Sequence, residues 1–335
     1  MTRPCVPYLP PGRRPAFAVP PGACDSHVHV FGPYSRFPLA EDRSYTPVEA
    51  PVEAFLAHLE ALGFERGVIV TASAQGTDNS AMLDALRRHP ARFRGVAVLP
   101  PETTDRELDE MTAAGVRALR LNLLRGAAGE RTYRNGVGLE SLEALGPRLR
   151  ERGWHLQVWI HARDLAEALP ALEPCGMELV VDHMGRIDTR QDAPDHPGFR
   201  LLCDLLRDGR AWTKISGADR ITHGEAPWSG ADPFARALLA ANAARCVWGT
   251  DWPHIAYSDH PVPEDAALAD KLAGWCPDAA MLKAVLVDNP ARLYGFPAGS
   301  AEGGTAEGVN PAGKARTGSA EGGTAEGVNP AGKLT

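Results

Sequence analysis

The sequence predicts an α/β protein built as a (β/α)8 barrel of the TIM type. Short apolar runs rich in β-branched residues alternate with longer amphipathic segments, and this alternation repeats eight times along the chain. Parallel strands need connections long enough to return over the sheet, and amphipathic helices supply such connections. Eight units favour closure into a barrel, which needs about 250 residues. The chain has 335 residues, of which 44% are hydrophobic, so one large core can be filled.

The eight predicted strands are apolar runs of similar length. They span residues 23–31, 66–72, 93–99, 118–122, 155–160, 179–182, 211–215 and 246–249. The amphipathic segments predict the connecting helices. These cover residues 52–62, 79–89, 105–114, 139–152, 162–172, 198–207 and 233–243, and a further helical segment at 265–293 follows the last strand.

The two ends of the chain differ from the repeating part. Residues 1–20 are rich in proline and predict an irregular arm before a catalytic barrel at 21–297. In the remaining segment, 298–335, the stretch 299–314 recurs unchanged at 318–333. The repeated stretch lacks aromatic residues and has almost no branched apolar ones, so it predicts a disordered tail that arose by duplication. A functional repeat module is the alternative.

Charge and composition exclude several classes of protein. The formal net charge of −7 argues against nucleic-acid binding, which usually needs a basic excess. The proline-rich start contains no apolar run of the kind found in signal peptides, and no stretch approaches the ~18 apolar residues of a membrane span. The six cysteines include no C-x-x-C pair, which is typical of reduced thiols. We therefore expect a cytoplasmic protein without a nucleic-acid or membrane partner.

Two histidines stand late in the first predicted strand. His27 and His29 occur in CDSHVHVFG, and residues two apart in a strand point to the same face. Two buried, hydrogen-bonded structural histidines would produce the same pattern. The position before a Gly-Pro loop in a barrel strand favours an active site, because the deeper layers of such barrels are apolar.

Two further polar residues follow other strands. His183 comes directly after the sixth strand, in VVDHMGR, and Asp251 comes after the eighth, in VWGTDWPH. Each alone is weak evidence, since Asp251 could cap the next helix. Catalytic residues of barrel enzymes, however, come from the C-terminal ends of several strands. A carboxylate facing imidazoles would supply the base and the electrophilic partner that ester hydrolysis needs.

These motifs resemble the amidohydrolase superfamily. The H-V-H, D-H-M-G-R and G-T-D-W-P-H segments carry that resemblance, and ASAQGTDN, GVRALRLNLLR, GWHLQVWI and NPARLYGF are similar to its 2-pyrone-4,6-dicarboxylate lactonase branch. The similarity covers about residues 22–296. It implies an amidohydrolase-type barrel in which Asp251 activates water against a lactone carbonyl. The residues implied to polarise that carbonyl or hold the water are His27, His29 and His183.

The resemblance leaves the metal content open. Many members of the superfamily bind zinc through the H-x-H pair, histidines on the fifth and sixth strands and the final aspartate. Trp159 stands where the fifth-strand histidine would be, and tryptophan cannot bind zinc. His161 is a conceivable shifted ligand, although a loop position is the simpler interpretation. We favour a reaction without a cofactor, and zinc is the alternative; its ligands would be His27, His29, His183 and Asp251.

Four arginines near the catalytic end predict an anionic substrate, because guanidinium groups bind carboxylates in a bidentate manner. They are Arg120, Arg125, Arg186 and Arg220. Surface ion pairing is the alternative for any one of them. The resemblance adds further predicted substrate contacts, namely Tyr45, Thr77, Asn79, Trp159 and His254. Gln75 and Trp159 depart from the lactonase pattern, which leaves the identity of the acid open.

The sequence therefore predicts a hydrolase that opens a small carboxylated lactone, similar to 2-pyrone-4,6-dicarboxylate and drawn from the breakdown of aromatic acids. A sugar-acid lactonase, an aldarolactone isomerase and a zinc-dependent amidohydrolase or decarboxylase are rival enzymes. A barrel that only binds an anion is the non-enzymatic alternative. The oligomeric state is not indicated by the sequence.

Overall fold

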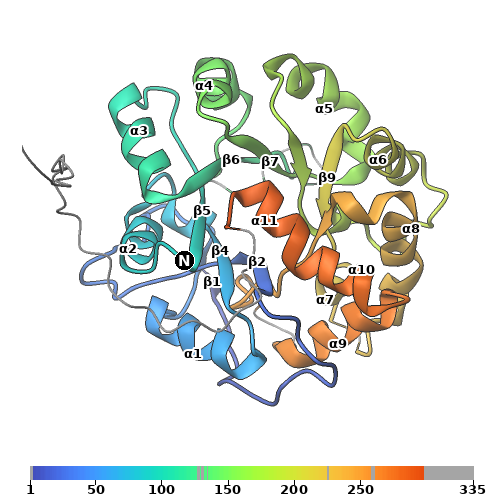
Figure 1. The fold of residues 1–335 in the computed structure, drawn as a ribbon. Helices are drawn as coiled ribbons and strands as arrows, with labels where there is room; N and C mark the ends of the chain where they lie inside the picture. The colour runs from blue at the N-terminus through green and yellow to red at the C-terminus, as the bar shows by residue number, and fades with distance from the viewer. Residues whose placement is uncertain are drawn as a thin grey trace, which may run out of the picture. The chain divides into compact units, whose positions relative to one another are not determined.

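The computed structural model describes residues 3–126, 129, 132–133, 135–224, 226–257 and 261–297. Eight of the strands in this part of the chain form one parallel sheet in the order β10-β9-β8-β7-β6-β5-β4-β2, ringed by helices (Figure 1). The strands are β2 (Cys24–Val28), β4 (Arg66–Val70), β5 (Phe93–Ala97), β6 (Val116–Asn122), β7 (His155–Trp159), β8 (Leu179–Val181), β9 (Ala211–Lys214) and β10 (Cys246–Val247). The predicted (β/α)8 class and the eight predicted strands are confirmed.

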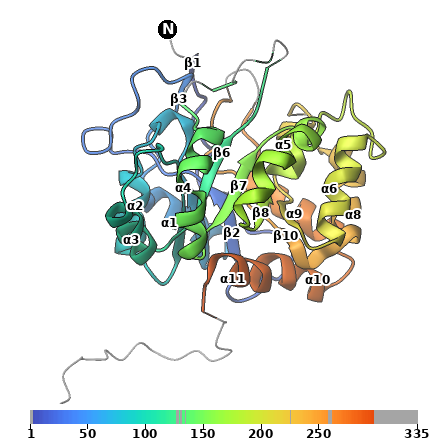
Figure 2. The same cartoon turned by 90° about the horizontal axis from the view of Figure 1, so that it is seen from above.

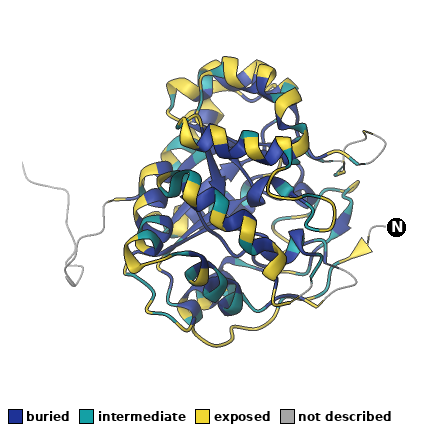
Figure 3. Ribbon diagram, turned by 90° about the vertical axis from the view of Figure 1, so that its right-hand side faces the viewer, coloured by how far each residue is buried: buried dark blue, intermediate teal, exposed yellow. Residues whose placement is uncertain are grey.

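The connecting helices lie close to their predicted positions. They are α1 (Val52–Leu62), α2 (Ser80–Arg88), α3 (Asp105–Ala114), α4 (Leu139–Glu151), α5 (Leu165–Leu172), α6 (Pro197–Arg207) and α8 (Asp232–Asn242), with the short α7 (Ala218–Ile221) after β9. Outward faces of these helices are exposed, whereas the strands are buried (Figure 3). Local signals explain the boundaries: Thr104 and Glu107 form a capping box at the start of α3, and Gly115 ends that helix in the left-handed conformation.

The segment predicted as one helix at 265–293 is divided. It contains α9 (Asp265–Trp275), α10 (Ala279–Lys283), a π-helical turn (Ala284–Asp288) and α11 (Asn289–Tyr294). Pro277 follows α9, and the Asp278 carboxylate accepts a hydrogen bond from the backbone N–H of Met281 to start α10. A proline followed by an N-cap residue ends one helix and begins another.

The ends of the chain lie partly outside the described residues. In the predicted arm at 1–20, β1 (Arg3–Pro4) pairs in parallel with β3 (Tyr45–Thr46). The predicted tail at 298–335 falls outside the described residues, and the division into arm, barrel and tail stays a prediction. No helix in the described part of the chain is long and apolar enough to cross a membrane.

The barrel closes between β2 and the segment that follows β10. The backbone N–H groups of Ser26 and His29 donate to the carbonyls of Trp248 and Trp252, and the Asp251 N–H donates to the His27 carbonyl. The Asp25 carboxylate reinforces this seam by accepting bonds from the N–H and hydroxyl of Thr250, at 3.0 and 2.6 Å. These hydrogen bonds hold β2 in register with the segment after β10.

Close approach at this seam requires glycine at position 249. A Cβ atom there would lie 2.4 Å from the His27 nitrogen and 2.8 Å from Asp25 Oδ1. We expect Gly249→Ala to lower the free energy of unfolding by about 3 kcal/mol or more, because the backbone must shift to relieve the clash. Gly274→Ala is the matched control: a Cβ at Gly274 meets nothing within 4 Å, and α9 should gain about 0.5–1 kcal/mol. Denaturant unfolding compares the two, and equal stability would contradict the closure argument.

The interior of the barrel is apolar at one end and polar at the other. Side chains such as Val68, Val96, Ala118 and Val180 form a cluster with Leu293, Tyr294 and Phe296 of α11 and the residues after it. In Figure 2, α11 lies beneath one end of the strands, while β1 and β3 lie at the opposite end. Charged and polar side chains lie above the apolar layer, towards the C-terminal ends of the strands. The catalytic end predicted from the sequence is therefore the end away from α11.

Candidate active site

A bulge in β2 presents both of its histidines to the barrel interior. The register of β2 against β4 shifts between Asp25 and Val28. The extra residue changes the alternation of side chains, so Cys24 and the pair His27 and His29 all point inward. Both imidazoles are buried, with 0% and 1% exposure.

The other two predicted catalytic residues occupy strained backbone positions. His183 follows β8 with φ of 50°, and Asp251 follows β10 with φ of 67°. Left-handed φ values are uncommon for residues other than glycine and cost roughly 1–3 kcal/mol each. Such strain persists where the surrounding structure enforces it, and it is concentrated at functional sites. These two turns direct both side chains toward β2.

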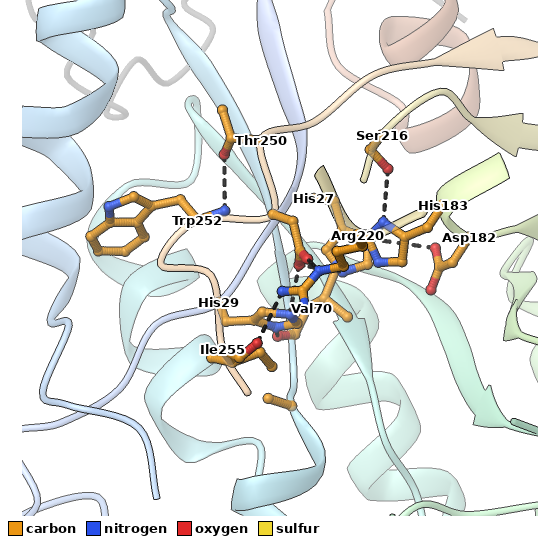
Figure 4. Close-up of polar contacts among 12 residues, drawn as sticks. His27, His29, Val70, Asp182, His183, Ser216, Arg220, Thr250, Trp252 and Ile255 are labelled. Carbon is orange, nitrogen blue, oxygen red and sulfur yellow. Dashed lines mark hydrogen bonds and ion pairs between the residues drawn. The ribbon is translucent and has the colours of Figure 1, made fainter. Parts of the chain in front are cut away.

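The four predicted catalytic side chains converge. Asp251 Oδ1 lies 3.4 Å from His29 Nε2 and 3.7 Å from His27 Nε2, and the His27 and His183 rings are 4.4 Å apart. Figure 4 shows these imidazoles together, with His29 on the carbonyl of Val70 and His183 on Ser216. The geometric prediction from the sequence, that side chains from three strands share one centre, agrees with this arrangement.

Arg220 pairs with the carboxylate at this centre. Its Nε donates to Asp251 Oδ2, and its Nη2 donates to the Ile255 carbonyl at 3.1 Å. Burial alone would raise the pKa of Asp251, but the adjacent guanidinium holds it well below its usual range. Asp251 is thus an ionised carboxylate throughout the neutral range, as a general base must be.

The three histidines are neutral at neutral pH. Burial lowers the pKa of His27 and His29, and it lowers the pKa of His183 to about 4. Neutral imidazoles carry one N–H and one lone pair each, so they can donate or accept a single hydrogen bond at the centre. They therefore act here as hydrogen-bonding groups rather than as cations.

A buried polar layer lies directly beneath the centre, and the sequence analysis missed most of it. The Asp182 carboxylate accepts bonds from Arg120 Nε at 3.3 Å and Gln157 Nε2 at 3.1 Å. Lys214, on β9, is completely buried, and its Nζ lies 3.6 Å from Asp182 Oδ1. Burial lowers the pKa of Lys214 to about 8, and Asp182 opposes that change. The sequence contains one signal for this buried polar layer, namely a lysine inside a predicted strand.

Arg120 lies on β6, near the end of the strand. It is an inward-facing residue with 5% exposure, paired with Asp182 and lying over the Trp159 ring at 5.0 Å. Because residues two apart on β6 share a face, Ala118, Arg120 and Asn122 all point into the barrel. The Nε atom of Arg120 is directed at a buried carboxylate, and a substrate contact through this residue stays a prediction.

Buried charges of both signs surround the centre. Arg120 and Lys214 pair with Asp182, and Arg220 pairs with Asp251. Two further buried carboxylates, Asp25 and Asp219, act on Lys214 and Arg220. Because guanidinium groups bind carboxylates, the arginines beside the histidines make the centre chemically suited to a carboxylated substrate.

Trp159 forms part of the wall beside the histidines. Its ring lies 6.3 Å from that of His183 and stacks on Tyr133 at 4.8 Å, and its buried indole nitrogen has no hydrogen-bond partner in the described part of the chain. Tyr45 contacts the edge of Tyr133 at 5.7 Å and accepts a hydrogen bond from Ser73. Tyr133 thus lies between Tyr45 and Trp159, which are both predicted substrate contacts. Tyr133 itself was not predicted from the sequence.

Two predicted arginines line a cavity of about 790 Å³ at the C-terminal ends of β6, β7 and β8. Arg125 is largely exposed and lies 3.7 Å from Glu167. Arg186 is more enclosed: its buried Nε has no hydrogen-bond partner among the residues that the structure describes, and burial lowers its pKa. Other residues that line this cavity include His161, Arg163, Asp164 and Asp188. A cavity of this size accommodates a small organic acid.

Three further predicted substrate contacts differ in their surroundings. The side-chain amide of Asn79 exchanges hydrogen bonds with the Val98 backbone through its oxygen and its nitrogen, and its oxygen also accepts from the Thr71 hydroxyl. Thr77 is exposed. His254 is buried; its Nε2 is 2.8 Å from Asp265 Oδ1 on α9, and its Nδ1 has no hydrogen-bond partner among the described residues. Protein partners thus occupy the Asn79 amide, and the substrate role of all three residues stays a prediction.

Among the described residues, two groups of side chains have the spacing of a metal site. They are His27 with His29 and Asp251, and His27 with Asp182 and His183. His29 fits such a role, because its Nδ1 lies 2.7 Å from the Val70 carbonyl and must carry the proton, which leaves the lone pair on Nε2. His27 does not fit, because its Nδ1 faces Lys214 Nζ at 3.2 Å. An ammonium donates only, so the His27 proton is on Nε2, where a metal would bind.

Comparison with known proteins agrees with this architecture. A model of the amidohydrolase family matches residues 24–296. A 4-sulfomuconolactone hydrolase of Rhizobium radiobacter is 37% identical over 84% of this chain and 92% of the relative. A 2-pyrone-4,6-dicarboxylate hydrolase of Comamonas testosteroni is 36% identical over the same shares of the two chains. A D-galactarolactone isomerase of Agrobacterium fabrum is 29% identical over 84% of this chain and 94% of the relative.

A solved structure extends the comparison to three dimensions. A crystal structure assigned to a 2-pyrone-4,6-dicarboxylic acid hydrolase from Pseudomonas putida superposes with a TM-score of 0.70 at 34% identity. The match covers 82% of this chain and 98% of that one.

Proposed function

Because the chain belongs to the amidohydrolase family, we propose that it is a hydrolase that opens a small carboxylated lactone with water activated by Asp251. The observation that carries this proposal is the position of Asp251 Oδ1, 3.4 Å from His29 Nε2 and beside two further imidazoles. The names of its relatives, which act on lactones, support the same class of substrate.

The reaction follows from the hydrogen-bonding capacity of these groups. His29 Nε2 and Asp251 Oδ1 are both acceptors, so a water molecule can donate one proton to each and direct its lone pair at a carbonyl carbon. Asp251 takes the proton as the water oxygen bonds to that carbon. The carbonyl oxygen becomes an oxyanion, which N–H groups of His27 and His183 stabilise. The ring C–O bond then breaks, and Asp251 returns its proton to the leaving oxygen.

The arginines of the site select the substrate. Arg220 beside Asp251, together with Arg186 at the cavity formed by the ends of β6, β7 and β8, favours a lactone that carries one or more carboxylates. The proposal includes Arg125, Arg186, Arg220, Tyr45 and Trp159 as substrate contacts. It requires no metal ion, because the H-x-H pair does not present two lone pairs. A role in the breakdown of aromatic acids and a cytoplasmic location remain predictions.

Hydrolysis of a lactone panel tests the proposal. We expect the purified chain to release protons, followed with a pH indicator, from at least one of 2-pyrone-4,6-dicarboxylate, a sulfonated muconolactone and a sugar-acid lactone. The rate should be the same before and after chelator treatment, with Asp251→Asn as the blank. Rearrangement without proton release would instead support an isomerase, and activity that needs added zinc would contradict the metal-independent reaction. No reaction with any lactone would contradict the proposed function.

A further inference from the structure

Lys214 is a buried cation for which the proposed reaction has no direct use. It lies at the end of β9 with 0% exposure, beneath the catalytic centre. Its Nζ donates to the Ser26 carbonyl at 2.9 Å and lies 3.2 Å from His27 Nδ1 and 3.6 Å from Asp182 Oδ1. Three acceptors thus surround the three N–H groups of an ammonium. Burying a charge at this depth is costly, so the arrangement calls for an explanation.

The contact with His27 determines where that imidazole carries its proton. Lysine has no acceptor atom as an ammonium ion, so Nδ1 must present its lone pair to Nζ. A neutral imidazole then has its single proton on Nε2. The Nε2 atom faces the centre, 3.7 Å from Asp251 Oδ1, and it is buried without a hydrogen-bond partner. It is an N–H group directed at the space where a carbonyl oxygen would lie.

The neighbouring histidine has the opposite tautomer. His29 Nδ1 lies 2.7 Å from the Val70 carbonyl, which can only accept, so the His29 proton is on Nδ1 and Nε2 is an acceptor. The two histidines of the H-x-H pair thus present one donor and one acceptor to Asp251. Two zinc-binding histidines would instead each present a lone pair, with the other nitrogen donating to a carbonyl or carboxylate.

The structure also contains the group that would support the other tautomer of His27. Asp182 Oδ1 lies 3.5 Å from His27 Nδ1, and within the described residues its ion pair with Lys214 Nζ at 3.6 Å is too long to be a hydrogen bond. Without Lys214, this carboxylate could accept a proton from Nδ1 and leave the lone pair on Nε2. The result would be the carboxylate–histidine arrangement that orients metal ligands.

We infer that Lys214 is a positioning residue that holds His27 as the Nε2–H tautomer, making it a donor to the substrate carbonyl and an unsuitable ligand for a metal ion. The effect on turnover rests on the proposed function, whereas the tautomer and the metal affinity do not. The inference therefore assigns to one lysine the difference between a hydrogen-bonding centre and a metal centre in this barrel.

The tautomer is measurable without a substrate. In a long-range ¹H–¹⁵N spectrum of the native, chelator-treated chain, we expect His27 Nε2 to be protonated and Nδ1 unprotonated, with the signals assigned by their loss in His27→Gln. In Lys214→Met the protonated nitrogen should become Nδ1. Lys271→Met is the matched control, since Lys271 pairs with Asp232 on the outer helices, and its spectrum should equal that of the native chain.

Metal affinity provides the second readout. Titration with Co²⁺, followed by visible absorption, should show binding at least about tenfold tighter to Lys214→Met than to the native chain or Lys271→Met. Adding Asp182→Asn to Lys214→Met should reverse this gain. Lys214→Met should also lower kcat more than it raises KM, because His27 no longer donates to the oxyanion.

Two results would overturn the inference. One is a native chain in which His27 Nε2 is unprotonated, which can be measured even if the lysine variant does not fold. The other is a folded Lys214→Met that keeps the native tautomer, whatever its affinity for Co²⁺. A chain that opens no lactone but shows the tautomer change would retain this inference and contradict only the proposed function.

Discussion

Replacing Asp251 by asparagine should lower kcat by about 10²–10⁴-fold, the contribution typical of a general base. The amide has the size of the carboxylate but cannot take a proton from water. KM should change little, because the predicted substrate contacts are other residues. Steady-state kinetics on the lactone identified by the panel measure both constants.

The control for this substitution is Asp232→Asn. Asp232 pairs with Lys271 at 2.8 Å on the outside of the barrel, so its variant should retain the native kcat. Circular dichroism and thermal unfolding establish that both variants are folded. A near-native rate in folded Asp251→Asn would show that another group is the base.

Removing the guanidinium of Arg220 changes both the base and the substrate site. Arg220 Nε donates to Asp251 Oδ2, and this contact keeps the pKa of Asp251 low in spite of burial. In Arg220→Met the effect of burial dominates, so the pKa of Asp251 rises. Because the base acts only when ionised, activity at acidic pH is lost first. The acid limb of kcat/KM, which reports the free enzyme, should therefore move to higher pH.

The same variant tests the recognition of the substrate carboxylate. Hydrogen bonds to charged groups contribute about 1.5–3 kcal/mol, so kcat/KM at neutral pH should fall by about ten- to hundredfold or more. Arg220→Lys keeps the charge and should keep the acid limb near its native position. A profile from pH 5 to 9 that is unchanged in Arg220→Met would contradict the role of this pair.

The agreement between sequence and structure is greatest where a local pattern decides the outcome. The residues of α1 and α3 were predicted without error, because capping and hydrophobic periodicity depend on neighbours in the chain. The division of 265–293 at Pro277 was also readable, since proline cannot continue a helix.

The partners of the predicted substrate contacts depend on other strands. Asn79 follows the end of β4, and its amide forms hydrogen bonds with the Val98 backbone after β5. Arg120 stands near the end of β6, and the alternation of that strand directs its Nε to Asp182 inside the barrel. In both cases the partner comes from another strand, which a local pattern does not reveal.

By itself, the sequence determined the (β/α)8 architecture and the strand ends that carry His27, His29, His183 and Asp251. Both follow from sequence patterns that extend over a few residues. Such patterns can be recognised in one segment without the rest of the chain. Only the tertiary structure decided which partner each charged group takes. Lys214 meets the Ser26 carbonyl across 188 positions of the chain, and Thr250 meets Asp25 across 225. Such contacts depend on how the closed barrel staggers its strands, and this stagger sets the proton positions on which the chemistry depends.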